Sequence, residues 1–155
     1  MKKLDEVDAQ LLQLLQEDSK KTNKEYAHRL HLSTTAVYER IKRLERTGVI
    51  EKYVALVNRK KVDKQLLVFC HVKLVQHNRA FVLQFEREIL QLKEVVSCYH
   101  VSGDYDYILK VYVRDMEAYR EFMVTKLTAL QHIGSTHSTF GISEIKNTTA
   151  IMLTS

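Results

Sequence analysis

LSTTAVYERIKRLERTGVI, residues 32–50, decides the fold of the first part of this chain. The stretch opens with a serine, which is favoured at helix N-caps, and it ends near Gly48, which favours a helix stop. Apolar residues at helical spacing predict a buried face between these two signals: Val37, Ile41 and Leu44. The opposite face is polar and basic, so we expect a negatively charged partner to lie against it.

Two further helices are predicted before this one. The first begins near Asp5, and the second opens with TNKE, in which Thr22 and Glu25 form a capping box. Only about three residues separate the second helix from the third, so the two helices must meet at a sharp angle. Two helices joined in this way, the second with a basic outer face, indicate a helix-turn-helix whose second helix enters the major groove of DNA.

The outer face of the third helix is predicted to contact the DNA. Its N-terminal part would reach the base edges: Thr34, Thr35 and Tyr38. Its cations would favour phosphates, which supply affinity without sequence information: Lys42, Arg43 and Arg46. Glu39 could accept a hydrogen bond from a cytosine or pair with Arg43 one turn on, and we expect the pair within the helix.

The basic residues are unevenly distributed along the chain. The net charge is +5, and residues 1–62 hold 14 Lys and Arg against 9 Asp and Glu, whereas residues 63–155 hold 10 of each. The whole excess therefore lies in the segment that carries the predicted helices, which indicates a polyanion as the partner of that segment alone. A solvated basic surface without a partner is the alternative.

The composition is typical of a soluble globular protein. Hydrophobic residues make up 45% and charged residues 28% of the chain, and no apolar run approaches the ~18 residues that a membrane span needs. Acidic residues follow the first lysines without an apolar core, so we expect no secretory signal and a cytoplasmic location. We expect Cys70 and Cys98 to be buried free thiols.

Residue patterns typical of catalysis, metal binding or a bound cofactor are not visible in the sequence. The seven histidines show no metal-ligand spacing. His100 and His137 could lie near one another across strands, and we interpret them as satisfied sheet residues. The four glycines are too few for a phosphate-binding loop, and no serine lies in a nucleophile elbow. We therefore expect a binding protein, not an enzyme.

Beyond Gly48 the pattern changes to that of strands and two further helices. VIEKYVALV, residues 49–57, predicts a strand. The later elements are a strand at 66–75, a helix after Asn78, strands at 95–103 and 104–113, a helix after Asp115, a strand at 135–145 and a short strand at 148–153. The order β-α-β-β-α-β predicts one sheet with both helices on one face. The other face needs a partner, and a second copy of the chain is the usual one.

Four stretches together resemble the Lrp/AsnC family of transcription regulators, which sense amino acids: LDEVDAQLLQLLQEDSK (4–20), LSTTAVYERIKRLERTGVIEKY (32–53), VSGDYDYILKVYVRDMEAYREFM (101–123) and STHSTFGISEIKNTTAIML (135–153). The resemblance covers nearly the whole chain. It implies an α+β protein with a helix-turn-helix head at residues 1–50, a β-strand hinge at 51–64 and a βαββαβ, ferredoxin-like effector and oligomerisation domain at 65–155. It also implies dimers that assemble into octamers or similar rings.

Three places depart from the family pattern. His31 occupies the turn of the helix-turn-helix, where the family often has glycine. LQHIGS, residues 130–135, replaces the usual Pro-Gly before the last long strand, and Asp63 and Lys64 stand where members usually carry a glycine. A histidine in the left-handed region is strained, so we expect local differences at this turn and at the hinge.

The SGDYD turn, residues 102–106, is the best candidate for a small-molecule site. A zwitterionic amino acid needs an anion for its ammonium group and N–H or hydroxyl donors for its carboxylate. Asp104 and Asp106 can supply the anion, and the backbone at Gly103 can supply donors. The resemblance implies effector binding at this turn between dimers, with the facing strand. The candidate residues are Ser102, Gly103, Asp104, Tyr105, Asp106, Thr136 and Ser138.

Structural roles are the alternatives for both carboxylates. Asp104 could simply favour the turn beside glycine. Asp106 lies in an otherwise apolar stretch, where an unpaired carboxylate is costly, so we favour a ligand role for it.

Together these features predict a sequence-specific regulator that binds double-stranded DNA and is modulated by a small amino acid bound between dimers. The alternative is a non-catalytic architectural protein that compacts DNA without a small-molecule effector. A ligand-induced change in DNA binding or in assembly distinguishes the two.

Overall fold

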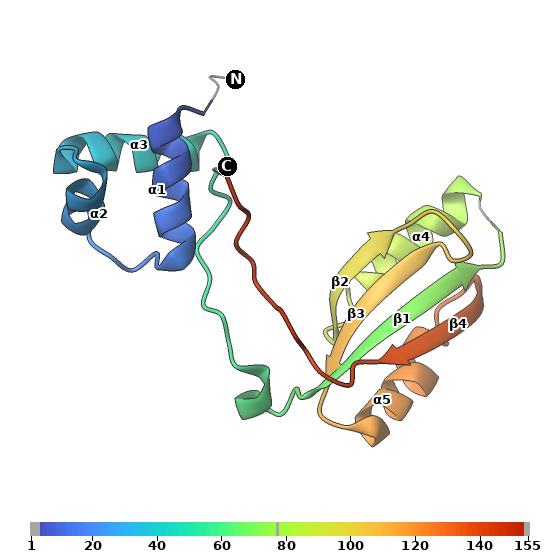
Figure 1. The fold of residues 1–155 in the computed structure, drawn as a ribbon. Coiled ribbons are helices and arrows are strands. Elements are labelled where there is room, and N and C mark those ends of the chain that lie inside the picture. Colours follow the sequence, from blue (N-terminus) through green and yellow to red (C-terminus); the bar gives the residue numbers. More distant parts are fainter. Residues whose placement is uncertain (1–3, 77, 154–155) are drawn as a thin grey trace. The chain divides into compact units, whose positions relative to one another are not determined.

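The computed structural model describes residues 4–76 and 78–153, which form two compact units (Figure 1). The first, the head unit, comprises the residues up to Leu56 and the tail that begins at Ile145. The second, the sheet unit, is Val57–Glu144. Each unit has a hydrophobic core of its own.

Three helices form the body of the head unit, as predicted: α1 (Glu6–Glu17), α2 (Asn23–Leu30) and α3 (Thr34–Arg46). Side-chain caps explain where they begin. Asp5 caps α1, and Thr22 and Glu25 form the predicted capping box of α2. The Ser33 hydroxyl accepts a hydrogen bond from the amide of Ala36 at 3.1 Å and so starts α3. Each cap satisfies backbone donors that a helix N-terminus leaves unpaired.

The backbone turns sharply at two positions in the left-handed region. His31 ends α2 with φ 54°, as its place in the turn predicted. Gly48 follows α3 with φ 72°, and the next residue, Val49, donates a backbone hydrogen bond to Leu44 at 3.0 Å. These turns fold the helices around one core: Leu11, Leu12, Leu15, Tyr26, Ala27, Val37, Ile41 and Leu44.

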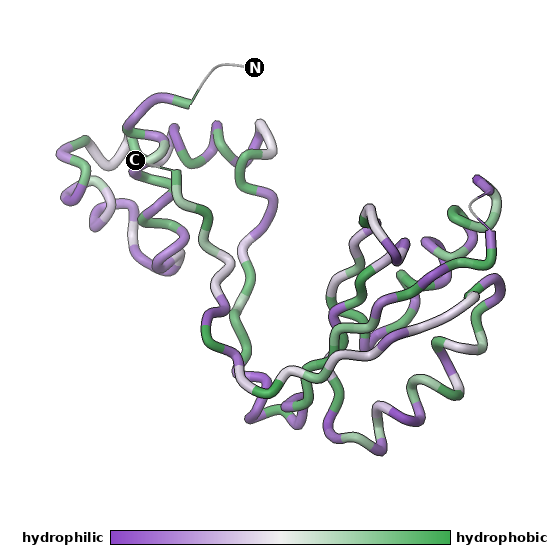
Figure 2. Tube along the Cα trace, turned by 45° about the vertical axis from the view of Figure 1, so that its right-hand side comes forward, coloured by the Kyte–Doolittle hydropathy of each residue, from purple (hydrophilic) through white to green (hydrophobic). Residues whose placement is uncertain are grey.

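The predicted strand at residues 49–57 is not formed. A short 3₁₀ turn at Arg59–Val62 follows this segment. Strand hydrogen bonds require a second strand, and β-branched composition alone does not supply one. Val54 and Leu56 remain exposed, and Figure 2 shows hydrophobic stretches along this part of the chain.

The predicted short strand at residues 148–153 is also absent, and a side chain takes the place of a partner strand. The Gln16 amide of α1 donates to the carbonyl of Ile151 at 2.9 Å and accepts from its backbone N–H at 2.7 Å. The tail, which the sequence grouped with residues 65–155, is therefore joined to the head unit.

The sheet unit has the predicted β-α-β-β-α-β order. Its elements are β1 (Leu66–Leu74), α4 (Arg79–Ile89), β2 (Val95–His100), β3 (Tyr107–Val113), α5 (Met116–Phe122), which continues as a π-helical turn at Met123–Leu127, and β4 (Ile133–Phe140). The strands pair antiparallel in the order β2-β3-β1-β4 (Figure 1). Asn78 and Asp115 cap the two helices, as predicted.

Both helices of the sheet unit pack on the same face of the sheet. Alternate residues of β1 and β3 meet aromatic side chains of α4 and α5 in the core: Val68, Cys70, Val72, Leu74, Phe85, Ile89, Tyr107, Leu109, Val111, Val113, Tyr119, Phe122 and Leu127. Cys70 is buried, Cys98 is half-buried, and both are free thiols.

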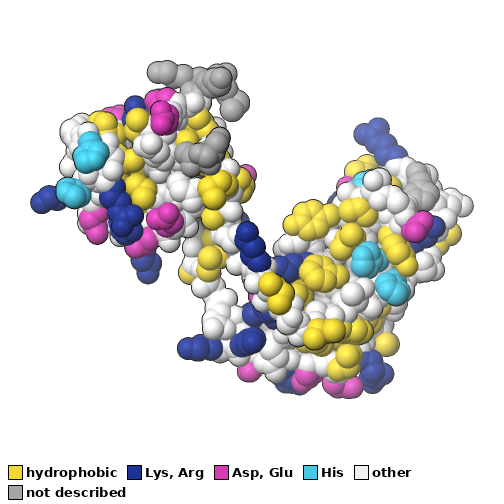
Figure 3. Space-filling model, in the orientation of Figure 1, with side chains coloured by type: hydrophobic (Ala, Val, Ile, Leu, Met, Phe, Trp, Pro, Cys, Tyr) yellow, Lys and Arg dark blue, Asp and Glu magenta, His cyan; other side chains and the backbone are white. Residues whose placement is uncertain are grey.

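The other face of the sheet is not covered by a helix. Phe69 and Tyr99 are among the large side chains exposed on it. Figure 3 shows hydrophobic and histidine side chains gathered on the face of this unit that is turned to the viewer. Such a surface is typical of a sheet that meets a partner.

Candidate nucleic-acid interface and ligand site

The outer face of α3 carries six of the seven residues predicted to contact DNA: Thr34, Thr35, Tyr38, Glu39, Lys42 and Arg46. All six are exposed, and the Tyr38 side chain keeps 45% of its surface. The buried face, with Val37 and Leu44, fixes the helix to α1 and α2, so the polar face is presented on a rigid element. This geometry suits insertion into a groove.

Arg43 departs from the predicted outer face. Only 27% of its side chain is exposed, and its guanidinium pairs with the Asp8 carboxylate of α1. Arg40 donates to the same carboxylate at 2.6 Å and to Asp5 at 2.7 Å. The expected pair between Glu39 and Arg43 is therefore replaced by an ion pair between α3 and α1.

The ion pairs that Asp8 makes with α3 were not expected from the sequence, which indicated only an Asp-x-x-Asp cap at Asp5. It is only 1% exposed, and two guanidinium groups neutralise its charge. The hydrogen bond from Arg40 also lowers the pKa of Asp5. A buried charge must be paired, so a second aspartate three residues after the N-cap, in an apolar helix, was the available signal. These contacts hold α3 against α1 within the head unit.

Lys42 is held in place on the outer face by a neighbour. Its ammonium group lies 2.9 Å from one oxygen of Glu45, and the Tyr53 hydroxyl donates to the other oxygen at 3.0 Å. Burial and this hydrogen bond to Glu45 raise the pKa of Tyr53 to about 12. Glu45 thus links the basic face of α3 to the segment that follows it.

The SGDYD turn borders a hollow of about 620 Å³ in the sheet unit. Its lining residues are His71, His100, Val101, Ser102, Asp104, Tyr105 and Ile108. Gly103 has φ 123°, a conformation that favours glycine, so it shapes the turn. The Asp104 carboxylate is exposed beside the hollow. The structure therefore brings Ser102, Asp104 and Tyr105 together as predicted.

Asp106 has the structural role that the sequence left as the alternative to the favoured ligand role. It is 8% exposed, and its carboxylate accepts a hydrogen bond from the backbone N–H of Leu74 at 2.7 Å. Its own N–H donates to Val72 at 2.9 Å. The side chain thus joins the end of β1 to the start of β3, and it does not line the hollow of Asp104.

Thr136 and Ser138 lie on the helix-covered face of the sheet. In β4 they pair with Val72 and Cys70, whose side chains belong to the core. The Ser138 hydroxyl lies 2.6 Å from that of Tyr119 in α5. Within one chain these two residues are therefore separated from the hollow at the SGDYD turn.

The strands place histidines near the hollow, and not the expected Thr136 and Ser138. The His71 ring lies 5.2 Å from Tyr105 and 6.0 Å from His137, between ring centroids. His100 instead stacks on Tyr107 at 4.7 Å, so the ring found beside His137 is that of His71 and not that of His100, which the sequence had suggested. Among residues 4–76 and 78–153, no group of three or more His, Cys, Asp or Glu is arranged to hold a metal ion.

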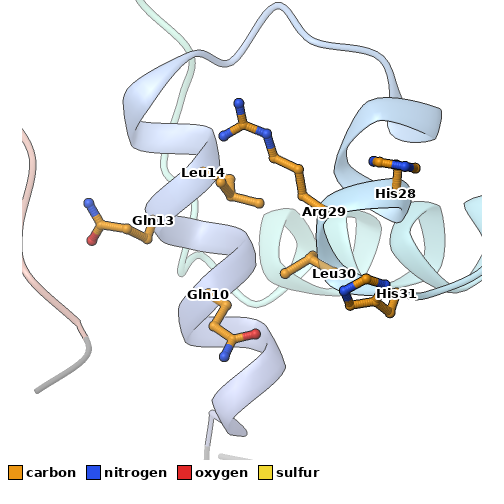
Figure 4. A pocket seen from close by; sticks show the side chains of 7 residues that line it. All are labelled: Gln10, Gln13, Leu14, His28, Arg29, Leu30 and His31. Atoms are coloured by element: carbon orange, nitrogen blue, oxygen red, sulfur yellow. The ribbon is translucent and has the colours of Figure 1, made fainter.

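A further hollow of about 630 Å³ lies between α1 and α2 in the head unit (Figure 4). It is lined by Gln10, Gln13, Leu14, His28, Arg29, Leu30 and His31. This lining has no carboxylate to receive an ammonium group, so it suits an amino acid less well than the hollow beside Asp104.

The described helices include none that is long and apolar enough to cross a membrane.

Comparison with known proteins gives matches to both units. Residues 4–45 match the AsnC-type helix-turn-helix domain, and residues 67–151 match the Lrp/AsnC ligand binding domain. The leucine-responsive regulatory proteins of Escherichia coli and Salmonella typhimurium are 37% identical over 152 residues, which is 98% of this chain and 93% of theirs.

Solved structures show the same likeness. A transcriptional regulator of Neisseria meningitidis in complex with L-methionine superposes with a TM-score of 0.92 at 32% identity and covers 96% of both chains. An AsnC family regulator of Agrobacterium tumefaciens gives a TM-score of 0.92 at 35% identity, also over 96% of both chains.

Proposed function

The chain belongs to the Lrp/AsnC family and is a DNA-binding transcriptional regulator of that type, and we propose that α3 reads the operator while the hollow at the SGDYD turn binds an amino acid. The observation that carries the proposal is the exposed face of α3. Thr35 and Tyr38 lie near its free N-terminal end, and Lys42 and Arg46 follow on the same side. Short polar side chains suit base edges, and cations suit phosphates.

The wild-type protein provides the first test of this proposal. Selection from a library of random duplexes should enrich one sequence, and its affinity should fall steeply with salt because phosphate contacts release counterions. Two-fold symmetric sites are expected if two heads bind together. Enrichment of no sequence, with salt-dependent binding retained, would favour an architectural protein that compacts DNA.

For the ligand, Asp104 is proposed to receive the ammonium group and the backbone at Gly103 the carboxylate. The complex of the Neisseria regulator with L-methionine supports an amino acid as the ligand class. Asp104→Asn keeps the shape of the side chain and removes its charge, so it should weaken binding of L-methionine or L-leucine in calorimetry. Asp106→Asn should have less effect on this site, because Asp106 contacts the backbone of Leu74.

The helix-free face of the sheet is proposed to bind a second copy, with dimers assembling further into an octamer or a similar ring. Exposed Phe69 and Tyr99 support this assignment. The proposed domains are a head at 1–50, a hinge at 51–64 and an effector domain at 65–155, whose tail from Ile145 lies with the head unit in this structure, and the protein is proposed to act on DNA in the cytoplasm. A ligand in the sheet unit then acts on the heads by favouring one arrangement of the assembly. Sedimentation with and without ligand tests this coupling.

A further inference from the structure

A second hollow in the sheet unit lies at the opposite end of β3 from the SGDYD turn, about 25 Å away by the rise of the strand. Its volume is about 410 Å³, and its lining residues are Val62, Asp63, Lys64, Glu94, Val113, Arg114, Ala118, Glu121, Phe122 and Lys126. Asp63 and Lys64 are the residues that stand where the family usually carries a glycine. Both side chains are charged in this chain, and both line the hollow.

Glu94 is the most informative residue of this hollow. One carboxylate oxygen pairs with the Lys126 ammonium group, and only 18% of the side chain is exposed. The other oxygen is buried and has no hydrogen-bond partner among the described residues. A buried acceptor without a partner is costly; this oxygen is shielded from solvent, so a donor that enters the hollow gains this contact when the lining side chains move to admit it.

The Glu94 carboxylate carries its charge under ordinary conditions. Burial opposes ionisation, but the hydrogen bonds from Lys126 and from the backbone N–H of Glu94 itself, together with the nearby charges of Lys126 and Lys64, outweigh burial and lower the pKa of Glu94. An ionised acceptor prefers a cationic donor, and such charge-assisted hydrogen bonds are stronger than neutral ones.

Cations for a carboxylate lie in the same hollow. Arg114 donates to Asp115 through Nε at 2.7 Å. This contact uses Nε alone and leaves the terminal amino groups of Arg114 as donors suited to a carboxylate. Lys64 adds a second positive charge close to Glu94. The lining holds three acidic and three basic side chains, so it favours a ligand without net charge over an anion or a cation.

The rest of the lining is apolar. Val113 and Phe122 belong to the core of the sheet unit, and Val62 and Ala118 lie beside them. A volume of about 410 Å³ exceeds that of one amino acid, and small-molecule sites commonly combine an apolar surface with a few placed polar groups. A small apolar side chain would therefore fit this surface.

Two unusual backbone conformations hold the charged groups of the hollow. Asp63 has φ 54°, in the left-handed region that non-glycine residues rarely adopt. Lys126 lies in the π-helical turn Met123–Leu127 that extends α5. Strained residues and π-helical turns are both frequent at functional sites.

We propose that this hollow is a second amino-acid site, which binds the zwitterion of a small apolar amino acid with its ammonium group at Glu94 and its carboxylate at Arg114 and Lys64. The site does not depend on the hollow beside Asp104, because the two lie at opposite ends of β3.

The test is calorimetry of the full-length protein with L-valine, L-leucine and L-methionine. Glu94→Gln and Arg114→Gln should each lower the affinity of this site at least tenfold, whereas Asp104→Asn should leave it unchanged. Glu117→Gln, an exposed change on α5 outside the hollow, is the matched control. For leucine, the half-charged analogues isoamylamine and 4-methylpentanoate should each bind at least tenfold more weakly than the zwitterion.

Three results would overturn the second site. The first is that the wild-type protein binds none of the three amino acids. The second is that Asp104→Asn abolishes binding while Glu94→Gln leaves it intact. The third is that the analogues bind as tightly as leucine. If circular dichroism shows that Glu94→Gln is unfolded, the exposed Arg114→Gln variant decides. Failure of the SGDYD site is a separate result, since binding would then be insensitive to Asp104→Asn.

Discussion

Replacing Asp8 with asparagine should loosen the recognition helix, because Asp8 holds two arginines of α3 against α1. Removing one partner of a buried ion pair costs about 3–5 kcal/mol when the remaining charge stays buried. Here the side chains of Arg40 and Arg43 are 25% and 27% exposed and can regain water. Arg40 also keeps Asp5 as a partner. We therefore expect a loss of about 2–3 kcal/mol, at or below the lower end of that range.

Hydrogen exchange of α1 and α3 amides measures this loss within the head unit, since it reports the free energy of local opening. Asp5→Asn is the matched control: its side chain is half-exposed, asparagine keeps the N-cap, and we expect a loss below about 1 kcal/mol. If Asp8→Asn reduces protection no more than Asp5→Asn does, the ion pair does not hold α3. Arg43→Ala should also reduce the protection of α1 and α3 amides, because Arg43 pairs with Asp8, and this loss of stability should exceed any direct loss of DNA affinity.

Three other outcomes are expected. Asp106→Ala removes the acceptor of the Leu74 amide, so the sheet unit should lose about 1–3 kcal/mol of unfolding free energy in urea titration; an unchanged midpoint would contradict the structural role. The lowered pKa of Glu94 means that its charged form is favoured in the folded state, so its contribution to stability is present above its usual pKa near 4.5 and is lost as pH falls through the folded value. Glu94→Gln should therefore reduce the fall in unfolding temperature that acid causes in the wild-type protein. An unchanged fall would exclude Glu94 as its source. Residues 65–155 alone should sediment as a dimer or larger, and a stable monomer at micromolar concentration would remove the proposed interface.

Features set by neighbouring residues were predictable from the sequence. The caps at Asp5, Thr22 and Ser33 involve residues within one turn, so their sequence signatures are sufficient to locate the helices. Val37 and its neighbours at helical spacing similarly predicted the buried face of α3. The β-α-β-β-α-β order followed from periodicity and from the turn at Gly103.

Features that depend on distant residues were not predictable in the same way. Arg43 turns inward because Asp8 lies on another helix, and a helical wheel does not contain that partner. Thr136 and Ser138 lie on the helix-covered face because β4 pairs with β1 in one register, and a shift of one residue would reverse their orientation. The segment at 49–57 has the composition of a strand but finds no paired strand in this structure.

The central claim is that α3 reads base sequence through its N-terminal residues and anchors to phosphates through its cations. Fluorescence anisotropy of wild-type, Thr35→Ala and Lys42→Ala proteins, on operator and random duplexes across a salt series, tests it most directly. Thr35→Ala should reduce the difference in binding free energy between operator and random duplex by about 1–3 kcal/mol. Lys42→Ala should lower the affinity for both duplexes by a similar factor, and it should reduce the slope of log affinity against log salt concentration by about one. Identical behaviour of the two variants, or a gap that neither changes, would contradict the claim.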